Sequence, residues 1–548
     1  MTFVRALQPL LAKSDTLVSE DGLGNYLENC ESIERTISAA VILRNEDTIP
    51  KILKLAEQLS ETDDAFIVHA ISSGNNWGYG SSLPSADHKN TLLVDLSELD
   101  KILFFDNTTG VITIQPGVTQ EKLYQFLSEN HYSFLVPTTG AGPTCSIIGN
   151  ALERGYGITP YTDHFMAVNS IKGYLADGSI YRSALHDLDL TESRYIHRAF
   201  KWGIGPYLDG IFSQSGYGIV TEMSLQLKHI PECVESFFIL LPENEQLEKA
   251  THLIYEILKK HEGIVGSINL MDLHRTISMK AVNPNLGKPQ ATLTETQEEE
   301  IRKREGLARW TIMGTIYNSK EVVKAVKRDI KRMLKSIRCR TLFTNDLRMK
   351  FIKGALSFFP FSSLSRPAEF LTTIKRAEKI MKGSPDRLAL ELAYWKNEIH
   401  REKTYNPAKD NCGVLWYAPL VRTEPKNVSK YVEMVRSICE KHSIDSFITI
   451  TNFKQGLGDS TIPILYNKDD AQDVQNAKNC LRELTETGLS MGFIPYRLNV
   501  DQQQKLLDKN APFWTAEAKI KQALDPHQVL NPGRYNPSYQ HRKMDARS

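Results

Sequence analysis

A short loop of small polar residues constrains the fold of this chain more than any other feature. Residues 71–82 read ISSGNNWGYGSS, nine of them Gly, Ser or Asn, and they follow AFIVHA, a run typical of a buried strand. Glycine permits positive φ angles, and consecutive N–H groups in such a turn form a concave nest for an anion such as phosphate. The loop matches neither G-x-G-x-x-G nor the lysine-containing phosphate loop. It therefore predicts an anion-binding turn of another kind.

The composition narrows the class of protein. The chain has 548 residues, enough for two or three domains, and 66 basic against 65 acidic residues, a balance that disfavours a nucleic-acid partner. No apolar run approaches the length of a membrane span. Seven scattered cysteines without a CxxC pair indicate reduced thiols rather than disulfides or a zinc site. We expect a soluble, cytoplasmic protein without membrane contact.

The secondary-structure pattern changes along the chain. Up to residue 234 strands and helices alternate, with a helix near residues 48–59, another capped by Thr119, and a hairpin turning at Asp177-Gly178. Residues 235–492 mix long charged helices with strands, which favours a second α+β unit built on an antiparallel sheet. A further helix is predicted for DQQQKLLDKN at residues 501–510.

Six stretches in chain order resemble the flavoprotein family of vanillyl-alcohol oxidase and p-cresol methylhydroxylase. They are ISSGNNWGYG, LLVDLSELDKI, ITIQPGVTQEKLYQFL, SIIGNALERGYGITPYTDHF, KWGIGPYLDGIFSQSGYGIVT and LDPHQVLNPGRY. The resemblance covers most of residues 38–220 and the C-terminal tail, and thins over the middle. It implies a two-domain α+β fold, in which residues 1–234 and 493–548 form an FAD-binding domain and residues 235–492 form an antiparallel-sheet cap over the isoalloxazine ring.

The resemblance also implies which residues bind FAD, with the opening loop around the pyrophosphate. They are Ser72, Ser73, Gly74, Asn75, Asn76, Trp77, Gly78, Pro137, Thr138, Ser146, Gly149, Asn150, Arg154, Gly157, Thr159, Gly218, Ile219, Val220 and Arg534. Within this set Trp77 is expected to serve packing. Asn75 stands where the family often has Arg or His, so a charge contact to the phosphates is missing. Glu153 and Arg154 are expected to form an internal ion pair near the cofactor.

Three residues resemble the family's phenolate-binding group. Tyr79 leaves the opening loop, and PYRLN supplies Tyr496 and Arg497 late in the chain. Hydride leaves a benzylic carbon easily only when the para oxygen is anionic, and two phenol donors with a guanidinium stabilise that anion. The alternatives are that Tyr79 is an aromatic plug behind the loop and that Arg497 forms a surface ion pair.

Two departures from the family affect the chemistry. Members of the family attach the flavin to a His or Tyr near positions 458–460, but this chain has Gly458, Asp459 and Ser460 there. FAD is therefore predicted to be held without a covalent bond. No acidic residue lies between Val136 and Ile148, where relatives place an aspartate. A protein base for water addition is thus in doubt, and hydroxylation, alcohol oxidation and side-chain desaturation stay open.

Other motifs carry weaker predictions. Tyr161, Asp163 and His164 are expected in a structural or cofactor-shell role, and Cys145 as a small buried residue. The basic run at residues 324–353 indicates a solvated helix face or a docking surface for an acidic carrier protein or electron acceptor. FFPFSS at residues 358–363 is expected in the core or the lining of the cap.

The sequence thus favours an FAD-dependent oxidoreductase that abstracts hydride from the benzylic carbon of a para-substituted phenol through a quinone methide. Its partners would be a small aromatic substrate, molecular oxygen or an electron-acceptor protein, and a second copy of the chain in a homodimer. One alternative is an enzyme acting on a non-phenolic alcohol or 2-hydroxy acid, with Arg497 binding the carboxylate. Another is a non-catalytic flavin-binding interaction protein.

Overall fold

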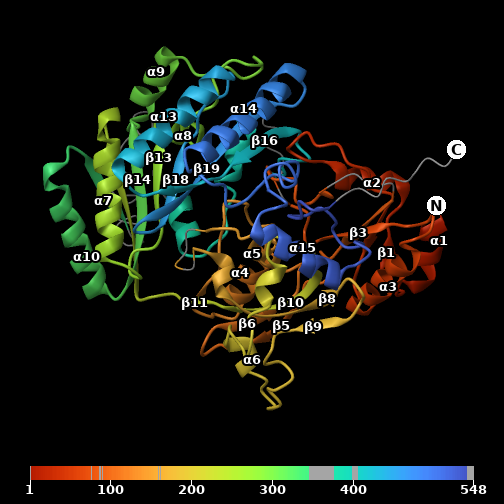
Figure 1. The fold of residues 1–548 in the computed structure, drawn as a ribbon. Coiled ribbons are helices and arrows are strands. Elements are labelled where there is room, and N and C mark those ends of the chain that lie inside the picture. Colours follow the sequence, from red (N-terminus) through yellow and green to blue (C-terminus); the bar gives the residue numbers. More distant parts are fainter. Residues whose placement is uncertain are drawn as a thin grey trace.

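A computed structural model describes most of the chain. The described residues are 2–75, 77–85, 88, 90–157, 160, 162–344, 375–397 and 405–539. Asn76, Thr159, Tyr161 and the FFPFSS stretch lie outside them. Elements from the two ends of the chain share one half of the molecule, where the red N-terminal strands lie near the dark blue α15 (Pro512–Leu524), and elements from the middle of the chain fill the other half (Figure 1).

The first half contains two sheets. The smaller has the order β1-β2-β4-β3, made of β1 (Thr16–Leu17), β2 (Ala39–Ile42), β4 (Thr91–Asp95) and β3 (Ile67–Ile71). Helices α1 (Thr2–Leu7) and α3 (Ile49–Leu59) contribute apolar side chains to the core against it. The late residue Leu530 lies in the same core, because Val68 pairs with it as an isolated bridge. The chain therefore returns to its first sheet near its end.

The second sheet carries the predicted hairpin. Its order is β5-β6-β10-β8-β9, made of β5 (Ile102–Phe105), β6 (Val111–Ile114), β10 (Gly218–Gln226), β8 (Val168–Leu175) and β9 (Ile180–Arg182). The antiparallel pair of β8 and β9 confirms the turn at Asp177-Gly178. Helices α4 (Gln120–Glu129) and α5 (Ile147–Leu152) pack on this sheet. The predicted cap is confirmed, since Thr119 Oγ1 accepts a hydrogen bond from Lys122 N at 3.2 Å.

An antiparallel sheet organises the middle of the chain. Its order is β15-β12-β14-β13-β18-β19-β16, and β17 pairs with β19; the bounds are β15 (Arg340–Thr344), β12 (Cys233–Leu241), β14 (Trp310–Asn318), β13 (Ile268–Asp272), β18 (Thr449–Lys454), β19 (Leu457–Asn467), β16 (Cys412–Tyr417) and β17 (Leu420–Arg422). Four helices cover its outer face, namely α7 (Leu247–Lys260), α10 (Lys320–Met333), α13 (Pro425–Lys441) and α14 (Ala471–Ser490) (Figure 1). The α+β fold with an antiparallel-sheet unit is thus confirmed.

Strand alternation decides what each face of this sheet carries. Ile268 and Leu270 of β13 and Ile450 of β18 point into the core under the helices. Their neighbours Asn269 and Met271 therefore face the other way, toward the half built from the chain ends. The inner face of the sheet is thus free to line a cavity.

One secondary-structure prediction is wrong. Residues 501–510 form turns rather than a helix. The apolar residues of this stretch, Leu506 and Leu507, are adjacent and cannot form a helical stripe. Gln503 is instead buried, and its Oε1 accepts a hydrogen bond from Tyr535 N at 3.2 Å. Within the described ranges no helix is both long enough and apolar enough to cross a membrane.

Candidate functional site

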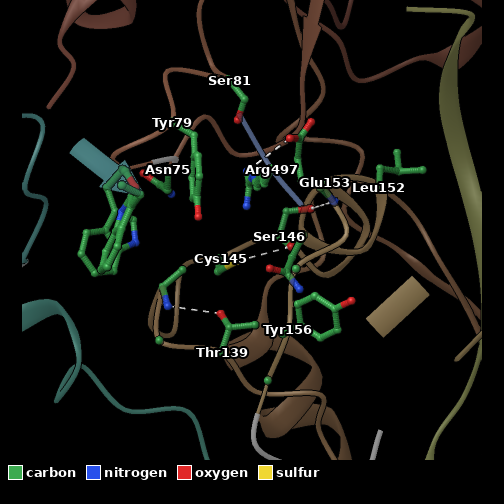
Figure 2. A pocket seen from close by; sticks show the side chains of 18 of the residues that line it. Asn75, Tyr79, Ser81, Thr139, Cys145, Ser146, Leu152, Glu153, Tyr156 and Arg497 are labelled. Carbon is green, nitrogen blue, oxygen red and sulfur yellow. Dashed lines mark hydrogen bonds and ion pairs between the residues drawn. The ribbon is translucent and has the colours of Figure 1, made fainter. Parts of the chain in front are cut away.

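A cavity of about 450 Å³ lies between the two halves of the molecule. One side, the loop wall, is lined by residues from segments 70–75, 77, 79–82, 139–153, 155–157 and 212–220, together with Tyr496, Arg497, Asn531 and Arg534. The other side, the sheet wall, consists of residues on the inner face of β13, β14, β18 and β19 together with Arg275, Met279 and residues 377–392. Figure 2 shows Tyr79, Glu153, Tyr156 and Arg497 gathered around the same space.

Close backbone packing shapes the loop wall. A Cβ on Gly149 would lie 2.4 Å from Ser72 Oγ, and one on Gly157 would lie 2.3 Å from the carbonyl oxygen of Thr138. Gly74 has a φ of 66°, which favours glycine. Ser146 caps helix α5, since its Oγ accepts a hydrogen bond from Gly149 N at 3.0 Å. The predicted glycines and serines thus let separate loops meet at the cavity.

Most residues predicted to bind FAD line this cavity. They are Ser72, Ser73, Gly74, Asn75, Trp77, Ser146, Gly149, Asn150, Gly157, Gly218, Ile219, Val220 and Arg534. Trp77 also packs edge-on against Trp416, with ring centroids 5.3 Å apart, and it accepts the Trp416 Nε1 hydrogen bond through its carbonyl oxygen. Asn76 and Thr159 lie outside the described residues.

Four residues of the predicted set lie off the cavity surface. Gly78 donates its N–H to Glu31 Oε1 at 2.5 Å, and its Cα faces the Trp416 ring. Pro137 lines a separate, much smaller pocket. Thr138 is buried, and its Oγ1 donates to the carbonyl oxygen of Ile380 at 2.9 Å. The side chain of Arg154, the fourth, turns elsewhere.

The expected ion pair between Glu153 and Arg154 is wrong. Arg154 has a φ of 52°, so the chain turns sharply and the guanidinium reaches Ser213 Oγ at 3.1 and 3.0 Å. Glu153 instead pairs with two arginines from the C-terminal part of the chain. Arg497 Nη2 lies 3.3 Å from Glu153 Oε2, and Arg534 pairs with Oε1. One carboxylate therefore joins the end of α5 to two arginines of the C-terminal segment.

The three residues of the predicted phenolate group come together at the cavity. Arg497 stacks on Tyr79, with its Cζ 4.0 Å from the ring centroid. Backbone hydrogen bonds hold the two segments, since Val500 N donates to Tyr79 O at 3.0 Å and Tyr496 N donates to Ala418 O at 3.1 Å. Tyr79 lines the cavity, and the ion pair of Arg497 with Glu153 is only 11% and 13% exposed rather than on the surface.

The electrostatics of this group favour an added anion. Burial raises the pKa of Tyr79 to about 12, while Arg497 and Tyr496 lower it, so the phenol stays a hydrogen-bond donor at neutral pH. Burial also raises the pKa of Tyr496 well above its usual range. Arg497 Nε is buried, and within the described structure it has no hydrogen-bond acceptor. A ligand oxygen at this position would supply one.

Sequence reasoning missed an acid in the sheet wall. The sequence marks Asp459 only as a position that cannot bind flavin covalently. It lies on β19, directly across from Thr451 on β18, and lines the cavity. Its Oδ1 is buried without a hydrogen-bond donor in the described structure, and burial raises its pKa to about 7. The available signal is an acid in a largely apolar strand, on the face that alternation turns away from the core.

The residues of the weaker sequence predictions have mainly structural contacts in the described part of the chain. Asp163 caps a short helix through a hydrogen bond from Phe165 N at 3.0 Å, and His164 bonds Asn150 through its Nδ1 at 2.7 Å. Cys145 is buried at the cavity edge, where burial raises its pKa. On α10, Lys327 forms an ion pair with Glu235, so this lysine of the basic run already has an acidic partner. The described residues hold no cluster of His, Cys, Asp or Glu suited to a metal ion.

Comparison with known proteins identifies the family. A family described as "FAD binding domain" matches residues 37–184, and one described as "FAD linked oxidases, C-terminal domain" matches residues 421–535. The chain belongs to the p-cresol methylhydroxylase-type family of FAD-linked flavoproteins. FAD is its cofactor, and the first match spans most of the loop wall. The glycine-rich turn at residues 72–74, with a positive φ at Gly74, suits a ligand with phosphates.

Similar proteins with names share between 21% and 27% of their aligned residues with this chain. The chain is 27% identical over 478 residues to 1'-carboxy-chondrochloren decarboxylase of Chondromyces crocatus, covering 86% of each chain. It is 25% identical over 544 residues to the 4-cresol dehydrogenase [hydroxylating] flavoprotein subunit of Pseudomonas putida, covering 97% of this chain and 94% of the relative. The solved structure of 4-ethylphenol oxidase from Gulosibacter chungangensis superposes with a TM-score of 0.84 at 21% identity, covering 98% of this chain and 96% of the other. The chain is thus an FAD-linked oxidoreductase by family.

Proposed function

We propose that the protein removes a hydride from the benzylic carbon of a para-substituted phenol. The observation that carries this proposal is the meeting of Tyr79, Tyr496 and Arg497 at one end of the cavity, with Arg497 Nε buried and lacking an acceptor in the described structure. Two neutral phenols and a guanidinium stabilise a phenolate oxygen, because each donates toward the negative charge. The anion then feeds electron density toward the para carbon, which makes loss of hydride easier.

FAD, when bound, supplies the acceptor for that hydride. In this proposal the loop wall holds the cofactor through the amides of residues 72–75 and the loops around Gly149, Gly157 and Gly218, while Arg534 stays fixed by Glu153. The attachment is non-covalent: Gly458 and Ser460 offer no linkable ring or thiol, and no histidine lines the cavity in the described residues. Ser460 is buried and donates to Thr449 O at 2.9 Å.

Asp459 is proposed as the proton acceptor. It raises the pKa values of Tyr79, Tyr156 and Tyr496, so its carboxylate lies near the phenolate end. Transfer of the phenol's proton to Asp459 keeps a single negative charge there, because the carboxylate becomes neutral as the phenolate forms. With a pKa of about 7, Asp459 can take that proton and release it again near neutral pH.

Two relatives matched over nearly the whole chain are named for this substrate class. A 4-cresol dehydrogenase and a 4-ethylphenol oxidase are, by name, proteins that act on para-substituted phenols. The alternative, in which Arg497 binds the carboxylate of a 2-hydroxy acid, is distinguished by the comparison of phenols with 2-hydroxy acids described below. A non-catalytic interaction protein would have no need for buried polar atoms without partners on the described cavity wall, such as Asp459 Oδ1 and Arg497 Nε.

The remaining partners belong to the same proposal. Electrons would leave to molecular oxygen or to an electron-accepting protein, and the family resemblance favours a homodimer. A cytoplasmic setting is supported by the seven free cysteines, all without a disulfide.

Anaerobic mixing of the purified flavoprotein with 4-alkylphenols tests the proposal. We expect the flavin absorbance to bleach with 4-methylphenol or 4-ethylphenol, and not with ethylbenzene, which lacks the phenolic oxygen. 2-Hydroxy acids serve as the comparison set. Bleaching by a 2-hydroxy acid and by none of the phenols would refute the phenol assignment.

A further inference from the structure

A third guanidinium lines the cavity, and it belongs to the sheet wall. Arg275 lies on α8 (Leu273–Ser278), the short helix that follows β13, and its side chain lines the cavity. Its Nη1 donates to Ser278 Oγ at 3.2 Å, and in the described part of the chain it has no ion pair with a carboxylate. The neighbouring Asp272 is already engaged, because its Oδ1 accepts from Arg275 N at 2.9 Å and Ile448 N at 3.1 Å.

This arginine differs from the other two in the cavity. Arg497 and Arg534 share the carboxylate of Glu153. Arg275 has no such partner among the described residues, and burial lowers its pKa to about 10 despite the attraction of Asp272. Holding a cation away from water without a counter-ion is costly, so a ligand that brings the opposite charge gains more here than at the surface.

The sheet places Arg275 well away from the phenolate end. Thr451 on β18 is paired with Asp459 on one side and with Asn269 on the other, so these two residues stand two strand spacings apart, about 10 Å. Met271 lies two residues further along β13, roughly 7 Å, and α8 begins immediately after that strand.

The wall between the two ends presents apolar side chains beside the polar Asn269 and Thr451. Met271, Met279, Met313 and Leu392 line it. A ligand that bridges the two ends would therefore have an aromatic or aliphatic body with a polar group at each extremity.

We propose that the substrate is a para-substituted phenol whose side chain ends in a carboxylate, and that Arg275 binds this carboxylate. The proposal rests on the phenol assignment above and adds the second recognition element. A guanidinium forms paired hydrogen bonds with the two oxygens of a carboxylate. The benzylic carbon of such a molecule lies between its two anchored ends, so both anchors would help to hold it at the reaction position.

Matched acids and esters test the inference. The first probe pair is 3-phenylpropanoate and its methyl ester, which lack the phenol and report binding through the shift of the flavin absorbance. We expect the acid to bind about 10- to 100-fold more tightly than the ester, the usual gain of a charge-assisted contact. Arg275→Gln should abolish the preference and Arg275→Lys should retain part of it. Arg338→Gln is the control, since Arg338 pairs with Glu243 at 2.7 Å outside the cavity and should leave the preference intact.

The second probe set links the contact to the reaction. Anaerobic flavin reduction by 4-hydroxyphenyl acetate, propanoate and butanoate is compared with reduction by their methyl esters. We expect one chain length to show the largest gain in apparent affinity over its ester, and that gain to disappear in Arg275→Gln.

Each outcome separates this inference from the phenol assignment. If 4-ethylphenol reduces the flavin but acids and esters bind equally, the carboxylate proposal is wrong and the phenol assignment stands. If the acids are preferred but no phenol reduces the flavin, the phenol assignment fails while the carboxylate contact survives. A preference that persists in Arg275→Gln excludes Arg275 as its source. Should that variant not fold, the acid–ester comparison on the unmodified protein still decides whether the cavity prefers a carboxylate.

Discussion

The shape of the loop wall depends on close backbone packing at glycines, whereas that of the sheet wall depends on side chains presented by paired strands. In the loop wall Gly149 and Gly157 bring segments so close that a single methyl group would collide with a neighbour. In the sheet wall Asn269, Thr451 and Asp459 form one row across three paired strands, and each points into the cavity because of the strand pleat. A change of residue should therefore alter shape at the loop wall and chemistry at the sheet wall.

The largest expected effect is at Arg497, which comes from the loop side but acts through its side chain. Arg497→Gln should slow anaerobic flavin reduction by 4-ethylphenol about 10²–10³-fold, as for the loss of an oxyanion donor. Tyr79→Phe and Tyr496→Phe should each cost less, and their effects should not add, because all three groups act on one oxygen. Arg154→Gln is the matched control, since that guanidinium contacts Ser213 outside the cavity. Unchanged rates in all three variants would refute the phenolate assignment.

Asp459 tests the chemistry of the sheet wall. Asp459→Asn should slow flavin reduction at pH 8 about 100-fold, the lower range for general acid–base catalysis. The rate of the parent should rise with pH through about 7, as the carboxylate ionises, and this rise should be absent in the variant. Asp473→Asn is the control, because Asp473 is also buried but accepts from Asn467 N away from the cavity. A pH profile that is identical in the parent and Asp459→Asn would exclude the proton-accepting role.

The raised pKa of Asp459 also predicts how the stability of the fold depends on pH. The pKa of Asp459 is raised in the folded state, so the fold favours its protonated form. The free energy of unfolding should therefore fall as pH rises from about 4 to about 7, by up to about 4 kcal/mol from this group. Asp459→Asn should lose this contribution to the slope in urea unfolding curves measured across that range. A variant less stable than the parent at pH 8 would contradict the expected cost of the buried carboxylate.

Gly157 tests the loop wall. Gly157→Ala should weaken FAD binding about tenfold, because the added methyl group must displace the Thr138 backbone from 2.3 Å. Titration of the apoprotein with FAD, followed by flavin fluorescence, measures the dissociation constant. Gly24→Ala is the control, since nothing lies within 4 Å of a Cβ there. Equal affinities for the two variants would mean that the loops adjust freely.

The last prediction concerns how FAD is attached, and it needs no substitution in the protein. Acid precipitation of the purified protein should release all of the flavin into the supernatant, because the positions used for attachment in the family hold Gly458, Asp459 and Ser460. Flavin that stays in the pellet would show a covalent bond.

The two walls also differ in how far the sequence predicts them. The loop wall rests on motifs that are contiguous in the chain, such as ISSGNNWGYG, so the sequence alone predicts most of its residues. Tyr496 and Arg497 are paired with Tyr79 through family resemblance, because no local pattern connects residues so far apart. The ion pair predicted for Arg154 is wrong, since the positive φ of this residue is invisible in the letters Glu-Arg-Gly.

The sheet wall depends on strand register, which the sequence does not reveal. Asn269 and Asp459 meet through Thr451 only after β13, β18 and β19 pair in one particular alignment. Arg275 is in addition positioned by a six-residue helix that begins at the end of β13. Each of these residues, read alone, resembles an ordinary surface polar group. The residues that we expect to set substrate choice are therefore the ones least accessible to sequence reasoning.

The ion pairs of Glu153 with Arg497 and Arg534 have a consequence for how the chain folds while it is being synthesised. While the ribosome is still making the middle of the protein, Glu153 and Tyr79 have been produced but their partners do not yet exist. The outer edge of β3 also lacks its partner at that stage, since Val68 bridges to Leu530. Contacts across such sequence separation slow folding. A nascent chain should therefore hold an open, unfinished cofactor wall until nearly its last residues emerge, and chains halted before residue 496 should be unable to retain FAD.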